Sequence, residues 1–343
     1  MNSSFVTKKK SLGISVAIAT YNRADLLSKV LQAFTKQTLT PDRFELIICD
    51  SQSSDSTSFL IDKFKQENTD IALSYYHTQN ILASKRNLGV KMASYEIVVF
   101  LDDDCIPMPD FLAEHLSQFA LNQGVAPKSV FCGEVRFPIE WVNKSNYYRY
   151  RNSLHFKGQA GMRLPYNNIV VMNMSFLRSD FLNSVGGVNE GFVGYGSEDI
   201  DLGWRLVKSG YELVSSRAAI IHNEPSANIF GYSKKLFHSS RDGARYLLEC
   251  NQDAYQNLDW KYKLIDPTVK GSSFLVRFAQ KAISMLLSSR VAANLVMKYL
   301  LLTDQLPLLY SPLLYRYVMA YSYYQGAIAR SSVRQNVAGN WYS

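Results

Sequence analysis

Cysteine is scarce in this sequence, and its positions exclude two kinds of scaffold. The 343 residues contain four cysteines, which are Cys49, Cys105, Cys132 and Cys250. None stands in a CxxC or Cys–His spacing, which argues against a disulfide framework and against a structural zinc site. The expected environment is therefore a reducing one, and we expect a cytoplasmic protein.

Glycine-rich phosphate loops are also missing. The sequence contains neither GxGxxG nor GxxxxGK followed by Ser or Thr, so it supports neither a dinucleotide fingerprint nor a P-loop. It shows no internal repeat. Three lysines at positions 8–10 precede only a short apolar run with no small-residue cleavage pattern, so we expect no secretory signal.

Acidic residues are nearly absent from the C-terminal quarter of the chain. Residues 261–343 contain ten Lys or Arg but only Asp266 and Asp304, and this segment accounts for the whole net charge of +8. The first 260 residues are balanced, with 27 basic and 27 acidic side chains. The basic tail has no recognisable nucleic-acid-binding module, so we expect no nucleic-acid partner.

The tail also lacks an uninterrupted apolar run. Its best window, residues 284–302, is broken by Arg290 and Lys298, whereas a membrane span needs about 20 mostly apolar residues. A basic composition rich in Leu and Tyr is typical of interfacial helices. We therefore expect residues 228–343 to form a helical region that is peripheral at the inner face of the membrane. The alternative is that these helices simply pack on the rest of the protein.

What the sequence does contain is a regular alternation of strand and helix patterns. Apolar, β-rich runs alternate with segments that carry apolar residues at helical spacing, and Asn22 is the expected N-cap of the first helix. This alternation predicts an α/β fold with a parallel sheet and helices on both faces. The predicted strands are 13–20, 44–50, 71–76 and 96–104, and the predicted helices are 22–34, 55–66, 83–94 and 197–210.

Polar residues follow three of the predicted strands, at the edge where open α/β sheets bind ligands. An aspartate triplet is the least easily explained of them. Residues two apart on a strand face the same way, so we expect Asp102 and Asp104 to point together and Asp103 to point oppositely. A D-x-D arrangement provides oxygen ligands for Mg²⁺ or Mn²⁺, while the alternative is an acidic surface loop. The other strand-end residues are Thr20, Tyr21, Asn22 and Asp50.

A second acidic cluster and one histidine complete the candidate site. Glu198, Asp199 and Asp201 begin the helix predicted at 197–210, where acidic residues suit the positive end of the helix. Alternatively, one of them is a general base that deprotonates an acceptor hydroxyl. His222 ends an apolar run; a lone histidine there is more often structural, but the D-x-D upstream makes it a candidate third metal ligand.

Several segments together resemble glycosyltransferase family 2, of the GT-A fold, over about residues 12–225. They include "SVAIATYNRADLL", "IICDSQSSDST", "ASKRNLGV", "VVFLDDDCIP", "GYGSEDIDLGWRL" and "IIH". The resemblance implies a mixed, mainly parallel sheet flanked by helices over 12–227, with a nucleotide-binding half at 12–104, an acceptor half at 105–227 and an N-terminal tail at 1–11. It implies inverting, metal-dependent transfer from a UDP-, dTDP- or GDP-linked sugar to a glycan or lipid-linked acceptor.

The resemblance also implies a role for each candidate residue. Asp199 would be the catalytic base, and Glu198 would shape the acceptor site. Asp104, Asp102 and His222 would hold Mg²⁺ or Mn²⁺. The residues implied to contact the donor are Thr20, Tyr21, Asn22, Asp50, Arg86, Asn87, Asp102 and Asp103. One departure from the family pattern is Cys49, which replaces the first of two aspartates and leaves Asp50 alone.

Other functions fit less of the sequence. A sugar-phosphate nucleotidyltransferase would share the nucleotide-binding sheet, but its N-terminal glycine-rich phosphate loop is missing. A non-catalytic nucleotide-sugar-binding or membrane-scaffold protein would not need Asp104, Asp199 and His222. We therefore expect an enzyme of cell-surface polysaccharide or glycolipid biosynthesis.

Overall fold

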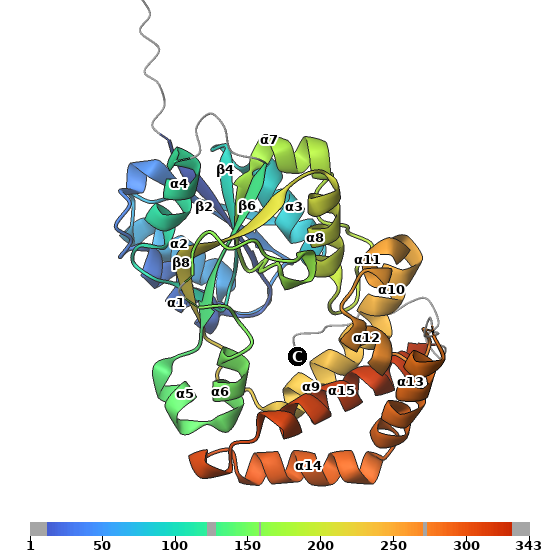
Figure 1. Cartoon of the computed structure of the whole chain (residues 1–343). Coiled ribbons are helices and arrows are strands. Elements are labelled where there is room, and N and C mark those ends of the chain that lie inside the picture. The colour runs from blue at the N-terminus through green and yellow to red at the C-terminus, as the bar shows by residue number, and fades with distance from the viewer. Residues whose placement is uncertain (1–11, 122–127, 158, 270–272, 331–343) are drawn as a thin grey trace, which may run out of the picture.

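An eight-stranded sheet forms the centre of the first two thirds of the chain (Figure 1). The computed structural model describes residues 12–121, 128–157, 159–269 and 273–330, so the predicted N-terminal tail 1–11 lies outside the described residues. The strands are β1 (Ile14–Thr20), β2 (Phe44–Asp50), β3 (Ala72–His77), β4 (Ile97–Asp102), β5 (Cys105–Pro107), β6 (Ser129–Arg136), β7 (Asn173–Leu177) and β8 (Glu212–His222).

The sheet is mixed and has the order β3-β2-β1-β4-β7-β6-β8-β5. Its first four strands in this order run parallel, and β7 pairs antiparallel with both β4 and β6. Strand β8 pairs parallel with β6 and antiparallel with the short β5. The predicted α/β fold and its four N-terminal strands are confirmed, and the carboxyl ends of β1, β2 and β4 meet at one edge.

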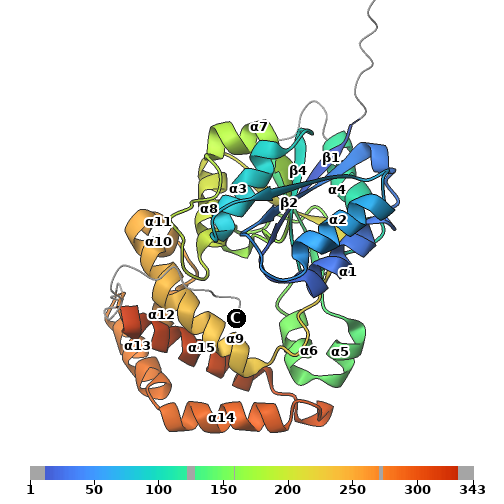
Figure 2. The same cartoon turned by 180° about the vertical axis from the view of Figure 1, so that it is seen from behind.

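Helices cover both faces of the sheet, as predicted (Figures 1 and 2). Alternating strand residues supply the two cores: Val16 and Ile18 pack toward α1, α2 and α4, and Ala17 packs toward α3 and α8. This alternation is the period of two expected for a strand that is buried on both faces. The helices are α1 (Ala24–Phe34), α2 (Thr57–Glu67), α3 (Leu82–Met92), α4 (Phe111–Leu121), α5 (Ile139–Lys144), α6 (Asn146–Asn152), α7 (Arg178–Asp180) and α8 (Glu198–Lys208).

The predicted N-cap of the first helix is wrong. Helix α1 begins at Ala24 with Arg23 in the cap position. Asn22 has a φ of 49°, and its Oδ1 accepts a hydrogen bond from the Ser54 amide, so it links two loops instead. An asparagine before a helical pattern fits either role, and here the left-handed backbone decides between them.

The C-terminal region is helical, as predicted. Helices α9 and α15 lie side by side, with the Oγ atoms of Ser233 and Ser322 2.6 Å apart, and α14 packs on both. No single helix among the described residues is long and apolar enough to cross a membrane, although α13 and α14, bent by 65°, meet the length and composition test as a pair. The helices are α9 (Ile229–His238), α10 (Ala244–Cys250), α11 (Gln252–Gln256), α12 (Trp260–Ile265), α13 (Phe274–Leu287), α14 (Arg290–Leu302) and α15 (Pro312–Ala329).

The C-terminal helices are joined to the rest of the protein through α6. The Tyr147 amide donates to a carboxylate oxygen of Asp304 at 2.8 Å. The Tyr150 and Tyr315 rings stack with their centroids 4.8 Å apart. These contacts fix the C-terminal helices against the sheet domain. The domain boundary predicted at residue 227 stays a prediction.

Candidate active site

A cavity of about 240 Å³ lies at the carboxyl ends of β1 and β4. Segments far apart in the sequence build it: these strand ends, α3, the start of α8, the end of β8 and one side chain of α9. This is the edge at which an open α/β sheet binds ligands. Nine of the predicted site residues line it, namely Thr20, Tyr21, Arg86, Asp102, Asp103, Asp104, Glu198, Asp199 and His222.

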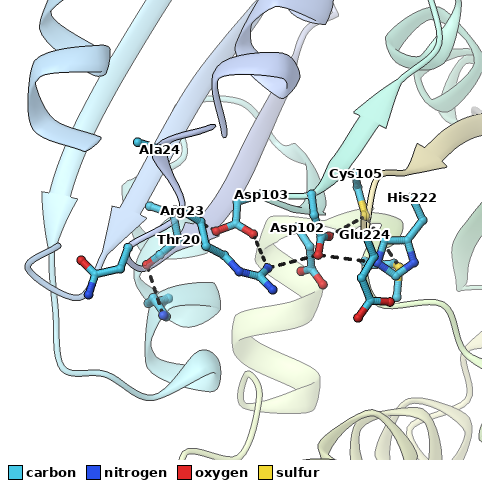
Figure 3. Close-up of polar contacts among 12 residues, drawn as sticks. Thr20, Arg23, Ala24, Asp102, Asp103, Cys105, His222 and Glu224 are labelled. Atoms are coloured by element: carbon cyan, nitrogen blue, oxygen red, sulfur yellow. Dashed lines mark hydrogen bonds and ion pairs between the residues drawn. The ribbon is translucent and has the colours of Figure 1, made fainter. Parts of the chain in front are cut away.

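The three consecutive aspartates do not point to alternating sides as the sequence predicted. Strand β4 ends at Asp102, and the chain turns at the next two residues before β5. A single Arg23 nitrogen contacts Asp103 at 2.8 Å (Figure 3) and Asp104 at 3.1 Å. Asp102 instead lies 3.2 Å from Arg86. The prediction that Asp102 and Asp104 point together is wrong, because strand alternation stops where the strand ends.

Burial and neighbouring charges give the two turn carboxylates opposite pKa shifts. Burial raises the pKa of Asp103 to about 6, although Arg23 and the Thr20 hydroxyl, which donates to it at 2.8 Å, act in the other direction. Burial would also raise the pKa of Asp104, but His222 and Arg23 outweigh it and lower that pKa. Asp104 therefore binds a proton less tightly than Asp103 does, which favours the ionised form that a cation would need.

Asp104 and His222 form the pair best suited to a divalent cation. Cys105 pairs with His222 across β5 and β8, and the Asn223 amide donates to the Asp104 carbonyl at 2.7 Å. These contacts hold His222 Nε2 3.6 Å from an Asp104 carboxylate oxygen, and within the described part of the chain the buried Nδ1 has no hydrogen-bond partner. A carboxylate and an imidazole suit Mg²⁺ or Mn²⁺ when substrate phosphates and water supply the other ligands.

Within the described ranges, no group of three or more His, Cys, Asp or Glu side chains gathers as a metal site. Asp102, the third predicted ligand, lies 3.2 Å from Arg86. Its role as a metal ligand therefore stays a prediction, as do those of Asp104 and His222, although these two side chains lie as a close pair.

Arg86 connects the strand end to the second acidic cluster. Its guanidinium lies 3.2 Å from Asp102, 3.5 Å from Asp199 and 3.8 Å from Glu198. Partial burial and the Glu198 charge raise the pKa of Asp199, and burial raises the pKa of Glu198, while Arg86 lowers both. The Asp199 side chain keeps 40% of its surface exposed, so it faces the cavity with a raised proton affinity.

The predicted N-terminal end of α8 is confirmed. Ser197 occupies the cap position with a φ of 70°, and Gly210 follows the end of the helix. The Ser197 side chain makes no capping hydrogen bond with the described residues. Asp201, the third acidic residue, is buried and lies 2.8 Å from Arg205. Its contacts are structural, which leaves Glu198 and Asp199 at the cavity.

Three predicted donor residues do not line the cavity. Asn22 links two loops, as described above. Asp50 is fully buried and accepts hydrogen bonds from Ser53 and from the Tyr75 hydroxyl at 2.7 Å. The Asn87 amide hydrogen-bonds both backbone groups of Val188. Their contacts hold the surrounding loops, and direct donor contact stays a prediction for all three.

Sequence reasoning missed three cations at the cavity. Arg23 follows β1 and looked like part of a helix start. Lys85 is buried, donates to the Thr20 carbonyl at 3.2 Å, and has its pKa lowered by burial. Lys235 comes from α9, hydrogen-bonds Glu224, and lines the cavity from the C-terminal region. A lysine on a helix more than a hundred residues from the aspartates gives no local signal.

Two family models match the chain: "Glycosyl transferase family 2" matches residues 15–184, and "N-terminal domain of galactosyltransferase" matches residues 152–226. Validoxylamine A glucosyltransferase from Streptomyces hygroscopicus subsp. limoneus is 28% identical over 232 residues, which cover 60% of this chain and 50% of that protein. Chondroitin synthase from Escherichia coli is 26% identical over 248 residues, which cover 62% of this chain and 35% of that protein. The chain thus spans half the length of the first relative and about a third of the second.

A solved mannosyltransferase from Pyrobaculum calidifontis, in complex with GDP-Man and Mn²⁺, has the same fold. It aligns with a TM-score of 0.56 and 19% identity over 93% of this chain and 86% of that one. This likeness confirms the GT-A arrangement of the sheet. The chain belongs to glycosyltransferase family 2.

Proposed function

We propose that the protein transfers a sugar from a nucleoside diphosphate sugar to a hydroxyl group, with inversion and with a divalent cation. The donor is UDP-, dTDP- or GDP-linked, and the acceptor is a glycan or a lipid-linked sugar of a cell-surface polysaccharide or glycolipid. One observation carries this proposal: the Asp104–His222 pair and the Asp199 carboxylate line the same cavity.

Asp104 and His222 would hold Mg²⁺ or Mn²⁺. The bound ion would neutralise the negative charge that develops on the departing diphosphate. The relatives and the mannosyltransferase fold support this assignment, since that solved neighbour was described with Mn²⁺ and GDP-Man. Arg23 and Lys235 line the same cavity and add positive charge around the phosphates.

Asp199 is the proposed general base. The acceptor oxygen forms a bond to the anomeric carbon while the bond from that carbon to the diphosphate oxygen breaks. The acceptor proton passes to Asp199, and the nucleoside diphosphate leaves. A single displacement of this kind inverts the anomeric centre and needs no covalent intermediate. Its raised pKa brings Asp199 closer to the operating pH, which favours proton transfer.

Glu198 and Arg86 position this base. Arg86 contacts both carboxylates of α8 and also Asp102 at the end of β4. The guanidinium therefore fixes the base relative to the strand end that faces the donor. A group held in reacting geometry by buried partners loses little entropy when the acceptor arrives.

A panel of UDP-, dTDP- and GDP-sugars tests the proposal. The purified protein should release nucleoside diphosphate from at least one donor with Mn²⁺ or Mg²⁺, and release should stop with EDTA. Asp199→Asn should keep donor protection against thermal unfolding but lose transfer by at least about a hundredfold, the usual range for a general base. Asp70→Asn, at an exposed loop position, is the matched control and should behave as the wild type.

The anomeric configuration of the product, measured by NMR coupling constants, tests inversion separately. An inverted anomer supports the single displacement. A retained anomer, or full turnover by Asp199→Asn, would contradict the assigned base.

A further inference from the structure

Exposed apolar side chains are concentrated in one stretch of the C-terminal region. Of the 22 large hydrophobic residues that are exposed in the described chain, 14 lie between residues 274 and 313. The two most exposed are leucines near the turn between α14 and α15, and Leu313 lies close to them. Leu308 is 99% exposed, Leu302 82% and Leu313 70%. Scattered exposed leucines are ordinary, but a cluster of this size marks an interaction surface.

Helix α14 explains how this surface arises. Its buried residues Ala293, Met297 and Leu300 follow helical spacing and face α15 and α9. The exposed residues Val291, Leu295 and Leu302 follow the same spacing on the other side. A helix that is apolar on both sides is typically covered on both sides. Packing among the residues that the structure describes covers only one of them.

Helix α13 repeats the pattern. Its exposed Phe274, Phe278 and Met285 lie four and then seven positions apart along the helix, as the three exposed residues of α14 do. They therefore form a stripe on one side of α13. Each stripe also includes one exposed lysine, which is Lys281 in α13 and Lys298 in α14. Each lysine stands seven positions after the first apolar residue of its stripe. A lysine inside an apolar stripe extends its charged end to a water interface while its stem stays on the apolar side.

The charge of the segment favours an anionic occupant. Residues 267–330 carry only one acidic residue, Asp304, which is engaged with the Tyr147 amide. Arg277, Arg290 and the two stripe lysines are exposed on the same two helices. A second copy of this chain would bring these positive charges together in a symmetric interface, which opposes self-association.

We propose that this surface binds the face of an anionic lipid bilayer. The docking surface consists of the exposed side chains of α13, α14 and the turn Leu306–Leu313. The apolar stripes enter the boundary between headgroups and acyl chains, and the basic side chains contact lipid phosphates. The inference goes beyond the proposed function, and its test does not depend on catalysis.

Docking would set the orientation of the catalytic cavity. Both views place α14 at the edge of the molecule farthest from the sheet, with α9 and α15 between them (Figures 1 and 2). Helix α9 provides Lys235 to the cavity wall. The layer that rests on the bilayer is therefore packed directly on the helix that borders the active site, an arrangement that suits a membrane-bound acceptor.

Vesicle flotation of the full chain tests the proposal. The wild type should float with vesicles of phosphatidylcholine and phosphatidylglycerol, and much less with phosphatidylcholine alone. The triple variant Leu302→Glu, Leu308→Glu, Leu313→Glu should bind at least about tenfold more weakly, because each leucine loses its transfer into the bilayer. Phe59→Glu on α2, a residue 71% exposed far from this surface, is the matched control and should float as the wild type.

A second variant tests the basic component without altering the apolar one. Lys281→Gln with Lys298→Gln should reduce binding to the anionic vesicles by about tenfold or more, because both lysines lose their attraction to the lipid phosphates. Absence of flotation by the wild type would overturn the proposal. So would equal flotation of the triple variant and Phe59→Glu, or a wild-type dimer in sedimentation that the triple variant loses while neither protein binds vesicles.

Discussion

Removing the Arg86 guanidinium should uncouple the two halves of the active site. One buried cation contacts Asp102, Glu198 and Asp199, and its side chain is 5% exposed. Removing one partner of a buried ion pair typically costs about 3–5 kcal/mol. Asp102 and Asp199 keep 27% and 40% of their side chains exposed, so water relieves part of this cost, and we expect Arg86→Gln to lose about 2–3 kcal/mol of unfolding free energy.

Thermal unfolding and a pH profile measure the two consequences. The melting temperature of Arg86→Gln should fall by about 5–10 °C, at about 2–4 °C for each kcal/mol in a domain of this size. Arg86 lowers the pKa of Asp199. Its removal should therefore move the acidic limb of the pH profile of kcat/KM to higher pH. Arg86→Lys keeps the charge but loses the planar fork, and should lie between the wild type and Arg86→Gln.

Arg163→Gln is the control for the loss of an arginine salt bridge. Arg163 lies 2.6 Å from Glu212 and is 78% exposed, so its loss should cost no more than about 1 kcal/mol. If Arg86→Gln had the same melting temperature as Arg163→Gln and kept the wild-type pH profile of kcat/KM, the central role given to Arg86 would be refuted.

Three further predictions concern the base, the C-terminal cation and the sheet packing. In the wild type, kcat/KM should fall as pH falls through the raised pKa of Asp199, because the base must be deprotonated. If kcat/KM fell only near pH 4, about the ordinary pKa of an aspartate, this prediction would be contradicted. Lys235→Met should weaken nucleoside diphosphate binding by about tenfold in calorimetry, at the strength of one charged hydrogen bond, whereas the exposed neighbour substitution Lys234→Met should not. Gly89→Ala should lower the unfolding free energy by about 1–3 kcal/mol, because a Cβ there would lie 2.5 Å from a side chain of β1. Gly231→Ala, where the added Cβ would lie 4.0 Å from Asn228 Oδ1, should be neutral or slightly stabilising. Equal melting temperatures of the two variants would disprove the packing argument.

The sequence predicted the sheet well because its signals are local. The apolar runs at 13–20 and 44–50 became β1 and β2, and the aspartates after the fourth run reached the predicted edge. The ends of parallel strands meet by topology, so a motif after a strand can be placed without knowing its neighbours. His222, which ends another apolar run, lines the same cavity, and so does Asp199, whose role only the family resemblance had implied.

The orientation of individual side chains was not predictable in this way. Asp103 and Asp104 both reach Arg23 because a turn replaces the strand after Asp102. Lys235 enters the cavity because α9 packs beside the sheet domain, which is a tertiary contact without a sequence pattern. The apolar outer stripe of α14 was visible as composition, but only the packing of its inner face shows which side is left uncovered.

Calorimetric titration of UDP, dTDP and GDP, with and without Mn²⁺, tests the central claim most directly. The account predicts that Mn²⁺ strengthens the binding of one nucleoside diphosphate to the wild type and to Asp70→Asn, and that Asp104→Asn loses this gain. An undiminished Mn²⁺ effect in Asp104→Asn would show that the cation is held elsewhere and would contradict the account.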